Sequence, residues 1–245
     1  TDGSIYISGN HNLTDDIYVA KYSPQGAQQW LSLAGGDEQD YPFDMAVDID
    51  GSTVITGFTS SQTYDDQVAG HGSRDVIATK LNPNGETLWS KVISGSGYDE
   101  GRSVIIQNDQ SILIAGMTSS RNFDDLESDG ELRSFITKIS SDGSQHLTQL
   151  VSPSISFADG ISSNNNGSLY IAGSIYSAFC GETNFGNQDS FLISIEDPQL
   201  IDTIDVNRNR FVDEVTNYQS LTASDRIDPI NPLGKIFCDN TLRNL

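Results

Sequence analysis

An alternation of oxygen-bearing side chains in the last fifth of the chain is the pattern that most directly suggests chemistry. Between residues 205 and 214, oxygen side chains stand at the first, third, fifth and ninth places: Asp205, Asn207, Asn209 and Asp213. Calcium takes six to eight hard oxygen ligands, and such a loop supplies them together with a backbone carbonyl at the seventh place. Phe211 occupies that seventh place. The segment therefore predicts a calcium site.

The same segment resembles a dockerin-type or EF-hand-like calcium loop, with two departures. Arg210 stands where the sharp turn normally needs glycine, and Thr216 stands where a bidentate acid is expected. Glu214 is the candidate replacement for that acid, in a non-standard geometry. The alternative interpretation is a polar turn held by Asn and Asp side chains, without an ion. Calcium is the cofactor that the sequence predicts.

Two acidic, glycine-rich segments, residues 35–40 and 95–100, have oxygen side chains as well. One interpretation is calcium binding by Asp37, Glu38 and Asp40, or by Asp99 with Glu100. We favour the other, in which the aligned Asp40 and Asp99 accept backbone N–H bonds and hold a turn between repeats.

Support for catalysis is weak. The chain has three histidines, which do not occupy equivalent positions: His11, His71 and His146. No HExxH, GxSxG, Walker or dinucleotide-binding motif is present. The carboxylate pairs at residues 65–66 and 124–125 have the residue types of a glycosidase acid/base pair. Each pair follows an aromatic residue, Tyr64 or Phe123, which favours a repeated turn that anchors a loop. The sequence therefore predicts no catalytic residue.

Composition narrows the classes of partner. Acids outnumber bases by 34 to 13, and the net charge is −21, which argues against nucleic acid and anionic membranes as ligands. The two cysteines, Cys180 and Cys238, form no CxxC pair, so a single disulfide and two free thiols both stay open. No apolar run is long enough for a transmembrane helix. Thr1 falls inside a repeat, which suggests a fragment or a processed product.

The positions of these residues follow from a repeat. A turn, a short apolar strand and a closing glycine occur four times, at residues 2–9, 50–57, 109–116 and 166–173. The closing glycines are 48, 59 and 57 residues apart. We expect each strand to end at its glycine. Periods of this length are typical of repeat folds.

Three further strands are expected in each repeat. A β-branched and aromatic strand with a lysine leads to a turn with glycine, and strands beginning at Trp30 and Trp89 follow. A fourth strand leads back to the opening block. Strand counts of three, four, four and about three predict an all-β fold: a β-propeller of four-stranded antiparallel blades over residues 1–197. Residues 198–245 form a tail that is a candidate for closing the propeller.

The repeated pattern resembles the bacterial seven-bladed (SBBP) β-propeller repeat family. The residues that carry the resemblance best are Gly57, Lys80, Gly85, Trp89, Gly95, Asp99 and Glu100, with first-repeat equivalents Gly9, Lys21, Gly26, Trp30, Gly35 and Asp40. The fourth repeat departs from it, because Ser194 replaces the lysine. The resemblance implies an exported or surface-attached repeat scaffold. A ring of seven blades needs about twice these repeats, so both a small closed ring and part of a larger propeller stay open.

These observations predict a non-enzymatic, calcium-binding β-propeller that acts as a binding or structural module. Its expected location is extracellular, periplasmic or at the cell surface, and its expected partners are a protein or glycan ligand, or the rest of a larger assembly. The alternative is an extracellular polysaccharide hydrolase or lyase with its site on the propeller face. We expect the long loops after each glycine to form the binding surface, and the recurring lysines, Lys21, Lys80 and Lys138, to pair with a neighbour in the blades.

Overall fold

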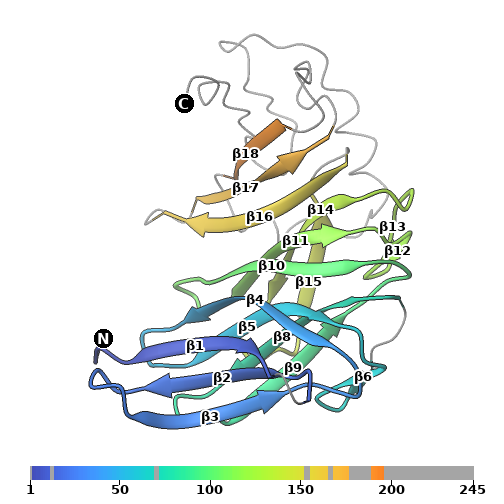
Figure 1. The fold of residues 1–245 in the computed structure, drawn as a ribbon. Coiled ribbons are helices and arrows are strands. Elements are labelled where there is room, and N and C mark those ends of the chain that lie inside the picture. The colour runs from blue at the N-terminus through green and yellow to red at the C-terminus, as the bar shows by residue number, and fades with distance from the viewer. Residues whose placement is uncertain are drawn as a thin grey trace.

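Four antiparallel sheets follow one another along the chain and stack face to face (Figure 1). The structure is a computed structural model that describes residues 2–11, 14–68, 72–151, 155–164, 168–176 and 189–195. Every regular element in these ranges is a β-strand, and none of them contains a helix that could cross a membrane. The predicted calcium loop and both cysteines lie outside the described residues.

Each sheet is built from strands that are consecutive or nearly consecutive in sequence. We call the sheets blades 1 to 4. Their strands are, for blade 1, β1 (Ile5–Asn10), β2 (Ile17–Tyr22) and β3 (Gln28–Ala34); for blade 2, β4 (Asp40–Val47), β5 (Thr53–Thr59), β8 (Asp75–Leu81) and β9 (Thr87–Ile93); for blade 3, β10 (Asp99–Ile106), β11 (Ile112–Thr118), β14 (Arg133–Ile139) and β15 (His146–Leu150); and for blade 4, β16 (Ser156–Ser163), β17 (Leu169–Ile175) and β18 (Asp189–Ile195).

This topology is that of β-propeller blades. Within each blade the strands are antiparallel neighbours in chain order, and the last strand of blades 1, 2 and 3 leads to the first strand of the next blade. The predicted fold class is confirmed, and so are the strand counts within the described residues. Two short hairpins were not expected from the sequence: β6 (Thr63–Tyr64) with β7 (Gln67–Val68), and β12 (Asn122–Phe123) with β13 (Leu126–Glu127). They lie in the long loops of blades 2 and 3.

The core is divided among the three junctions between blades. We call the side of a blade that faces the preceding blade its front face, and the side that faces the following blade its rear face. In blade 2, Ile55 and Ile77 lie on the front face and pack with Ile17 and Val19 of blade 1, whereas Val54 lies on the rear face against blade 3. Because both faces are covered, β5, β8 and β11 are buried along their whole length. Their apolar residues therefore run continuously and do not alternate.

The repeated closing glycine lies inside a strand, so the expectation that the strands end there is wrong. β5 continues past Gly57 to Thr59, and β11 continues past Gly116 to Thr118. A Cβ atom on Gly57 would lie 1.9 Å from the carbonyl oxygen of Tyr41 in the neighbouring β4. The glycine is therefore required by a close approach of two backbones.

The repeated tryptophan explains a second glycine. The indole N–H of Trp30 donates to the carbonyl oxygen of Pro83 in the turn of blade 2 (3.0 Å), and Trp89 donates equivalently to Ser141 of blade 3 (3.2 Å). The turn glycines Gly85 and Gly143 lie under these rings, where a Cβ atom would be 2.6 and 2.7 Å from the indole. The pattern of turn glycine and tryptophan is thus a contact between successive blades.

The recurring lysines behave differently from one another. Lys80 is buried and donates to the carbonyl oxygen of Ser141 in blade 3 (3.1 Å). Lys21 instead forms an ion pair with Asp2 of its own blade (3.8 Å), in the turn that precedes β1. Both lysines therefore pair with a neighbour in the blades, as predicted.

Two glycines with similar backbone conformations allow the contact between blades to be tested. Gly85 and Gly26 both have φ of +84°, but a Cβ atom on Gly26 would have no neighbour within 4 Å. We expect Gly26→Ala to cost roughly 1–2 kcal/mol of unfolding free energy through backbone strain alone. Gly85→Ala should cost about 1–3 kcal/mol more, because it also overpacks against Trp30. Urea unfolding of both variants measures the difference, and equal losses would contradict the contact.

Candidate functional site

The first strands of blades 2, 3 and 4 share an irregularity that positions the candidate site. β4, β10 and β16 each contain a β-bulge at an equivalent place, between Pro42 and Asp44, between Gly101 and Ser103, and between Ala158 and Gly160. A bulge leaves one residue unpaired and redirects its side chain. The three bulged residues are Phe43, Arg102 and Asp159.

Arg102 joins the three bulges. Its Nη1 donates to Asp159 Oδ1 in blade 4 (2.6 Å), and its guanidinium carbon lies 5.8 Å from the ring centroid of Phe43 in blade 2. Phe157 of blade 4 lies on it as well, at 5.3 Å. A guanidinium within about 6 Å of an aromatic ring is attracted by the ring's quadrupole. This one side chain therefore contacts both neighbouring blades.

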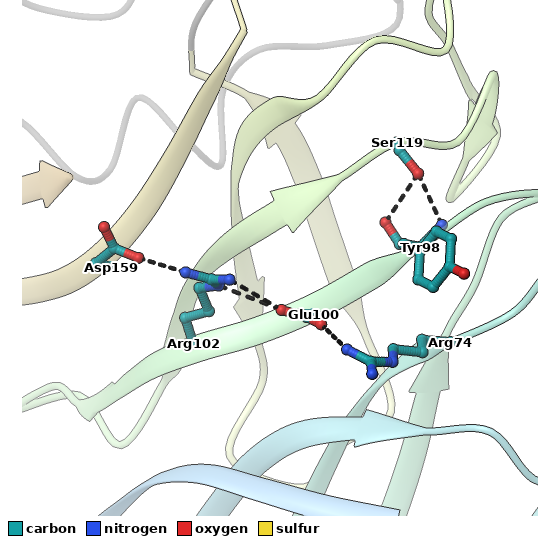
Figure 2. A network of polar contacts seen from close by, with 6 residues as sticks. All are labelled: Arg74, Tyr98, Glu100, Arg102, Ser119 and Asp159. Carbon is teal, nitrogen blue, oxygen red and sulfur yellow. Dashed lines mark hydrogen bonds and ion pairs between the residues drawn. The ribbon is translucent and has the colours of Figure 1, made fainter. Parts of the chain in front are cut away.

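Glu100 extends the contacts of Arg102 to a second arginine. Glu100 Oε2 accepts from Nη2 and Nε of Arg102, at 3.1 and 3.3 Å, and its other oxygen accepts from Arg74. Figure 2 shows the resulting alternation of Arg74, Glu100, Arg102 and Asp159. It runs from the residue before β8 in blade 2, through β10 in blade 3, to β16 in blade 4.

Aromatic rings lie against both arginines of this row. The Arg74 guanidinium is 4.1 Å from the Phe58 ring centroid and 5.7 Å from that of Tyr98. The backbone of Tyr98 is held by its N–H, which donates to Ser119 Oγ at 2.8 Å (Figure 2). Phe58, Tyr41 and Phe43 contact one another, as do Phe157 and Tyr176. We call this set the arginine–aromatic surface: Tyr41, Phe43, Phe58, Arg74, Tyr98, Glu100, Arg102, Phe157, Asp159 and Tyr176.

The surface exposes several of its rings, whereas its central carboxylate is covered. The rings of Tyr41 and Phe43 are each 42% exposed and Tyr98 is 51% exposed, whereas the Glu100 side chain is only 4% exposed. Two arginines face two acids, so the charges balance. The Arg102 guanidinium uses Nε, Nη1 and Nη2 on its two acids. The arrangement can therefore offer rigid aromatic faces to a ligand and little uncompensated charge.

The aligned aspartates of the acidic segments have a structural role. Asp40 and Asp99 are fully buried as the first residues of β4 and β10. Asp40 Oδ2 accepts the backbone N–H of Gly36 (2.7 Å), which confirms that it holds the turn between blades. Asp99 accepts from the hydroxyl groups of Thr118 (2.6 Å) and Ser120 (2.8 Å). Burial raises the pKa of Asp40 to about 6 and the pKa of Asp99 to about 7.

These raised pKa values have the range of a general acid, but the two carboxyl groups are enclosed by protein donors and cannot reach a substrate. The predicted loops are also shorter than expected, because Asp40, Asp99 and Glu100 belong to strands. Among the described residues, no three His, Cys, Asp or Glu side chains are arranged to hold a metal ion. Glu100 instead contributes to the arginine–aromatic surface.

The aspartate pairs form the predicted loop anchors. Asp65 and Asp66 have φ of 45° and 64° in the β6–β7 hairpin, and the β12–β13 hairpin has the same left-handed turn. The aromatic residue before each pair, Tyr64 or Phe123, is fully buried in a junction between blades. Asp65 accepts from Ser90. The pairs therefore hold the loops against the blades and offer no separate acid and base.

The two histidines within the described residues lie in different blades. His11 Nδ1 lies 3.0 Å from the Thr14 hydroxyl in an exposed turn, and His146 Nε2 lies 2.9 Å from Asp124 Oδ1 on blade 3. His71 lies outside the described residues, as do all six predicted calcium ligands, Asp205, Asn207, Asn209, Phe211, Asp213 and Glu214. The calcium site stays a prediction.

The sequence pointed to Glu100 but to neither arginine and to none of the six rings. Arg102 and Phe43 occupy equivalent bulges with unrelated side chains, so comparison of the repeats conceals them. One sequence feature does indicate the bulges. Two places after the aligned Asp40 and Asp99 stand Pro42 and Gly101, and both residue types are unfavourable inside a regular strand. Such residues mark a bulge.

Comparisons with known proteins add little to this geometry. No protein-family model and no curated protein matches the chain. A single-residue variant of the Synechocystis apocarotenoid oxygenase, a seven-bladed β-propeller, is similar in structure, with 13% sequence identity and a TM-score of 0.36. The match covers 77% of this chain and 45% of that one. At this level of similarity it carries no information on activity or ligand.

The raised pKa values of the buried aspartates make the free energy of unfolding depend on pH. Between about pH 4 and pH 7 the folded protein keeps a proton on Asp99 that the unfolded chain has lost, because the folded pKa is the higher one. Stability should therefore fall as the pH rises through this window, by at most ~1.4 kcal/mol per pH unit for one group. Urea unfolding at pH 5, 6, 7 and 8 measures this slope.

Asp99→Asn should make that slope shallower, since it removes one titrating group. Asp142→Asn is the matched control: Asp142 is exposed, and hydrogen bonds from Ser140 and Ser144 lower its pKa to about 2, below the window. A wild-type slope in Asp99→Asn, or a changed slope in Asp142→Asn, would contradict the assignment.

Proposed function

We propose that this chain is a non-enzymatic binding and structural module, and that its binding site is the arginine–aromatic surface. The observation that carries the proposal is a group of exposed rings that are held in place: Phe43 and Tyr98 lie against the paired arginines, and Tyr41 packs on Phe43 and Phe58. Exposed aromatic clusters with a polar rim are typical of interaction sites. Fixed rings bind well because little side-chain entropy is lost on association.

The chemistry of the surface favours a polypeptide partner. Tyr, Phe and Arg are enriched at protein–protein interfaces, and Tyr, Trp and Arg dominate their binding energy. The arginines are already paired with Glu100 and Asp159, so they provide no excess positive charge for a polyanion. The net charge of −21 also opposes acidic ligands. A glycan that stacks on the rings is the competing ligand class.

Location and family remain part of the proposal. Acidity and the resemblance to SBBP repeats support an exported or surface-attached protein, and the four described blades are compatible with part of a larger propeller. Enzymatic cleavage of an extracellular polysaccharide is the alternative function. It is less well supported, because both carboxyl groups of the surface, Glu100 and Asp159, are engaged in ion pairs.

The binding site can be tested with two probes, a phage-displayed random peptide library and a glycan array. We expect the wild-type chain to enrich peptides, and the variant Tyr41→Ser/Tyr98→Ser to lose at least about tenfold in affinity for them, since each exposed ring contributes on the order of 1 kcal/mol or more. Leu88→Ser is the matched control, because Leu88 is 55% exposed on β9, outside the surface.

Each outcome decides between the candidates. Peptide binding that both variants retain would place the site elsewhere. Glycan binding that only Tyr41→Ser/Tyr98→Ser loses would identify a glycan as the ligand of the same surface. Shortening of a bound glycan with time would establish the hydrolase or lyase in place of the binding module.

The calcium loop is tested separately. If residues 205–214 bind calcium in the folded protein, chelation should lower the melting temperature, since a ligand that binds only the folded state stabilises it. Asp205→Ala should lower it equally and remove the response to chelator. Asp142→Ala serves as a control with an unchanged response, and an unshifted wild-type melting temperature would contradict the site.

A further inference from the structure

The three junctions between blades follow one rule. A rear face always packs against the front face of the next blade, and an apolar cluster fills each junction. In the last of them, Leu113 and Ile136 on the rear face of blade 3 contact Ile171 and Ile193 on the front face of blade 4. A stack made by this rule ends in one unpaired front face and one unpaired rear face.

Within the described residues, the unpaired front face belongs to blade 1 and is apolar. Ile5 and Ile7 on β1 and Leu31 and Leu33 on β3 are 51%, 38%, 49% and 46% exposed. They lie on one side of the sheet, because Ile7 pairs with Ala20 and Ala20 with Leu31. The register equivalents of Ile7 in the other blades are each at most 1% exposed: Ile55, Ile114 and Ile171. The blade 1 face thus has the composition of a junction without its second half.

The unpaired rear face belongs to blade 4. Tyr170 and Ala172 on β17 are exposed, and Leu192 on β18 is half-buried beside them. Their equivalents on the rear face of blade 3, Leu113 and Ala115, are fully buried against blade 4. Within the described residues, blade 4 therefore presents the side of the sheet that a front face normally covers.

We propose that a second copy of this chain docks on the molecule, with the rear face of its blade 4 on the front face of blade 1. The two faces lie at opposite ends of the stack (Figure 1), so the described blades of one molecule do not bring them together. A second copy carries both halves of the missing junction. Such a contact is heterologous: it closes into a ring when the arc of blades permits and otherwise extends.

Charge acts against this association and gives it a characteristic salt dependence. Each chain carries a net charge of −21, so two copies repel one another at low ionic strength. The proposed contact itself is apolar and gains from the removal of its side chains from water. Association should therefore strengthen as salt is added, opposite to a contact held by ion pairs.

Light scattering on the full chain of 26.6 kDa, over a range of concentrations, is the test. We expect the mass to rise with concentration. The front-face variant Leu31→Lys/Leu33→Lys and the rear-face variant Tyr170→Lys/Ala172→Lys should each weaken association by about tenfold or more. Lysine is chosen because it reduces the negative charge and would, by charge alone, favour association. All four residues are exposed in one molecule, so the variants should fold, as circular dichroism would verify.

Mixing the two variants tests the head-to-tail geometry. The front-face variant keeps an intact rear face and the rear-face variant an intact front face, so a one-to-one mixture should form a complex of two chains that grows no further. Ile49→Lys is the matched control: Ile49 is 88% exposed in a turn of blade 2 and should associate like the wild type.

Four results would overturn the proposal. They are a wild-type chain that stays monomeric at every concentration, a front-face variant that associates normally, a mixture that stays monomeric, and slow hydrogen exchange of the β1 to β3 amides in a monomer. The last would mean that another part of the same chain covers the front face. The binding surface on β4, β10 and β16 is not altered by these substitutions, so failure here leaves the proposed function standing.

Discussion

A close approach between a backbone carbonyl oxygen and a glycine underlies both the regular stack and the irregular site. In blades 2, 3 and 4 the carbonyl oxygens of Tyr41, Glu100 and Phe157 lie 1.8–2.0 Å from where a Cβ atom on Gly57, Gly116 and Gly173 would be. No other residue type leaves that space. The approach brings the first strand of a blade close to the second, at the place where the first strand has its bulge. The bulge turns one side chain of the first strand out of the pleat. One steric constraint thus maintains the blade and also presents Phe43, Arg102 and Asp159.

The parts of the fold that could be predicted are those in which the same residues make the same contact in each blade. Trp30 and Trp89 each lie on the turn glycine of the next blade, and this contact explains why the turn glycine and the tryptophan recur in the sequence. Asp40 is predictable for a similar reason, because Asp99 repeats it as a buried carboxylate at the next crossover, although Ser156 takes this place in blade 4. The expected strand ends fail at Gly57, where glycine marks a close backbone approach. A propensity rule reads glycine as the end of a strand, whereas the tertiary contact places it inside one.

The arginine–aromatic surface could not be predicted from the sequence, for the opposite reason. Its chemistry comes from differences between equivalent positions: the three bulges carry a phenylalanine, an arginine and an aspartate, and only their stacking makes Arg102 meet its partners. Comparison of repeats finds what is shared and discards such positions as noise. The long loops were expected to form the binding surface, but two of them place their aromatic residues, Tyr64 and Phe123, in the core. In the loops the repeated aromatic residue is an anchor, whereas in the first strands the residue that differs between blades belongs to the candidate site.

The ion pairs of this surface form a frame that holds its rings in place, and we do not expect them to contact the ligand themselves. Glu100, whose side chain is 4% exposed, pairs with both arginines, and loss of both would leave its charge buried and uncompensated. The pairs therefore resist rearrangement, and the rings of Phe43 and Phe58 that contact the arginines are fixed with them. Because these residues come from three blades, the frame exists only while blades 2, 3 and 4 stay in register. The junctions that stabilise the stack, far from the exposed rings, thereby also determine the geometry that a ligand would meet.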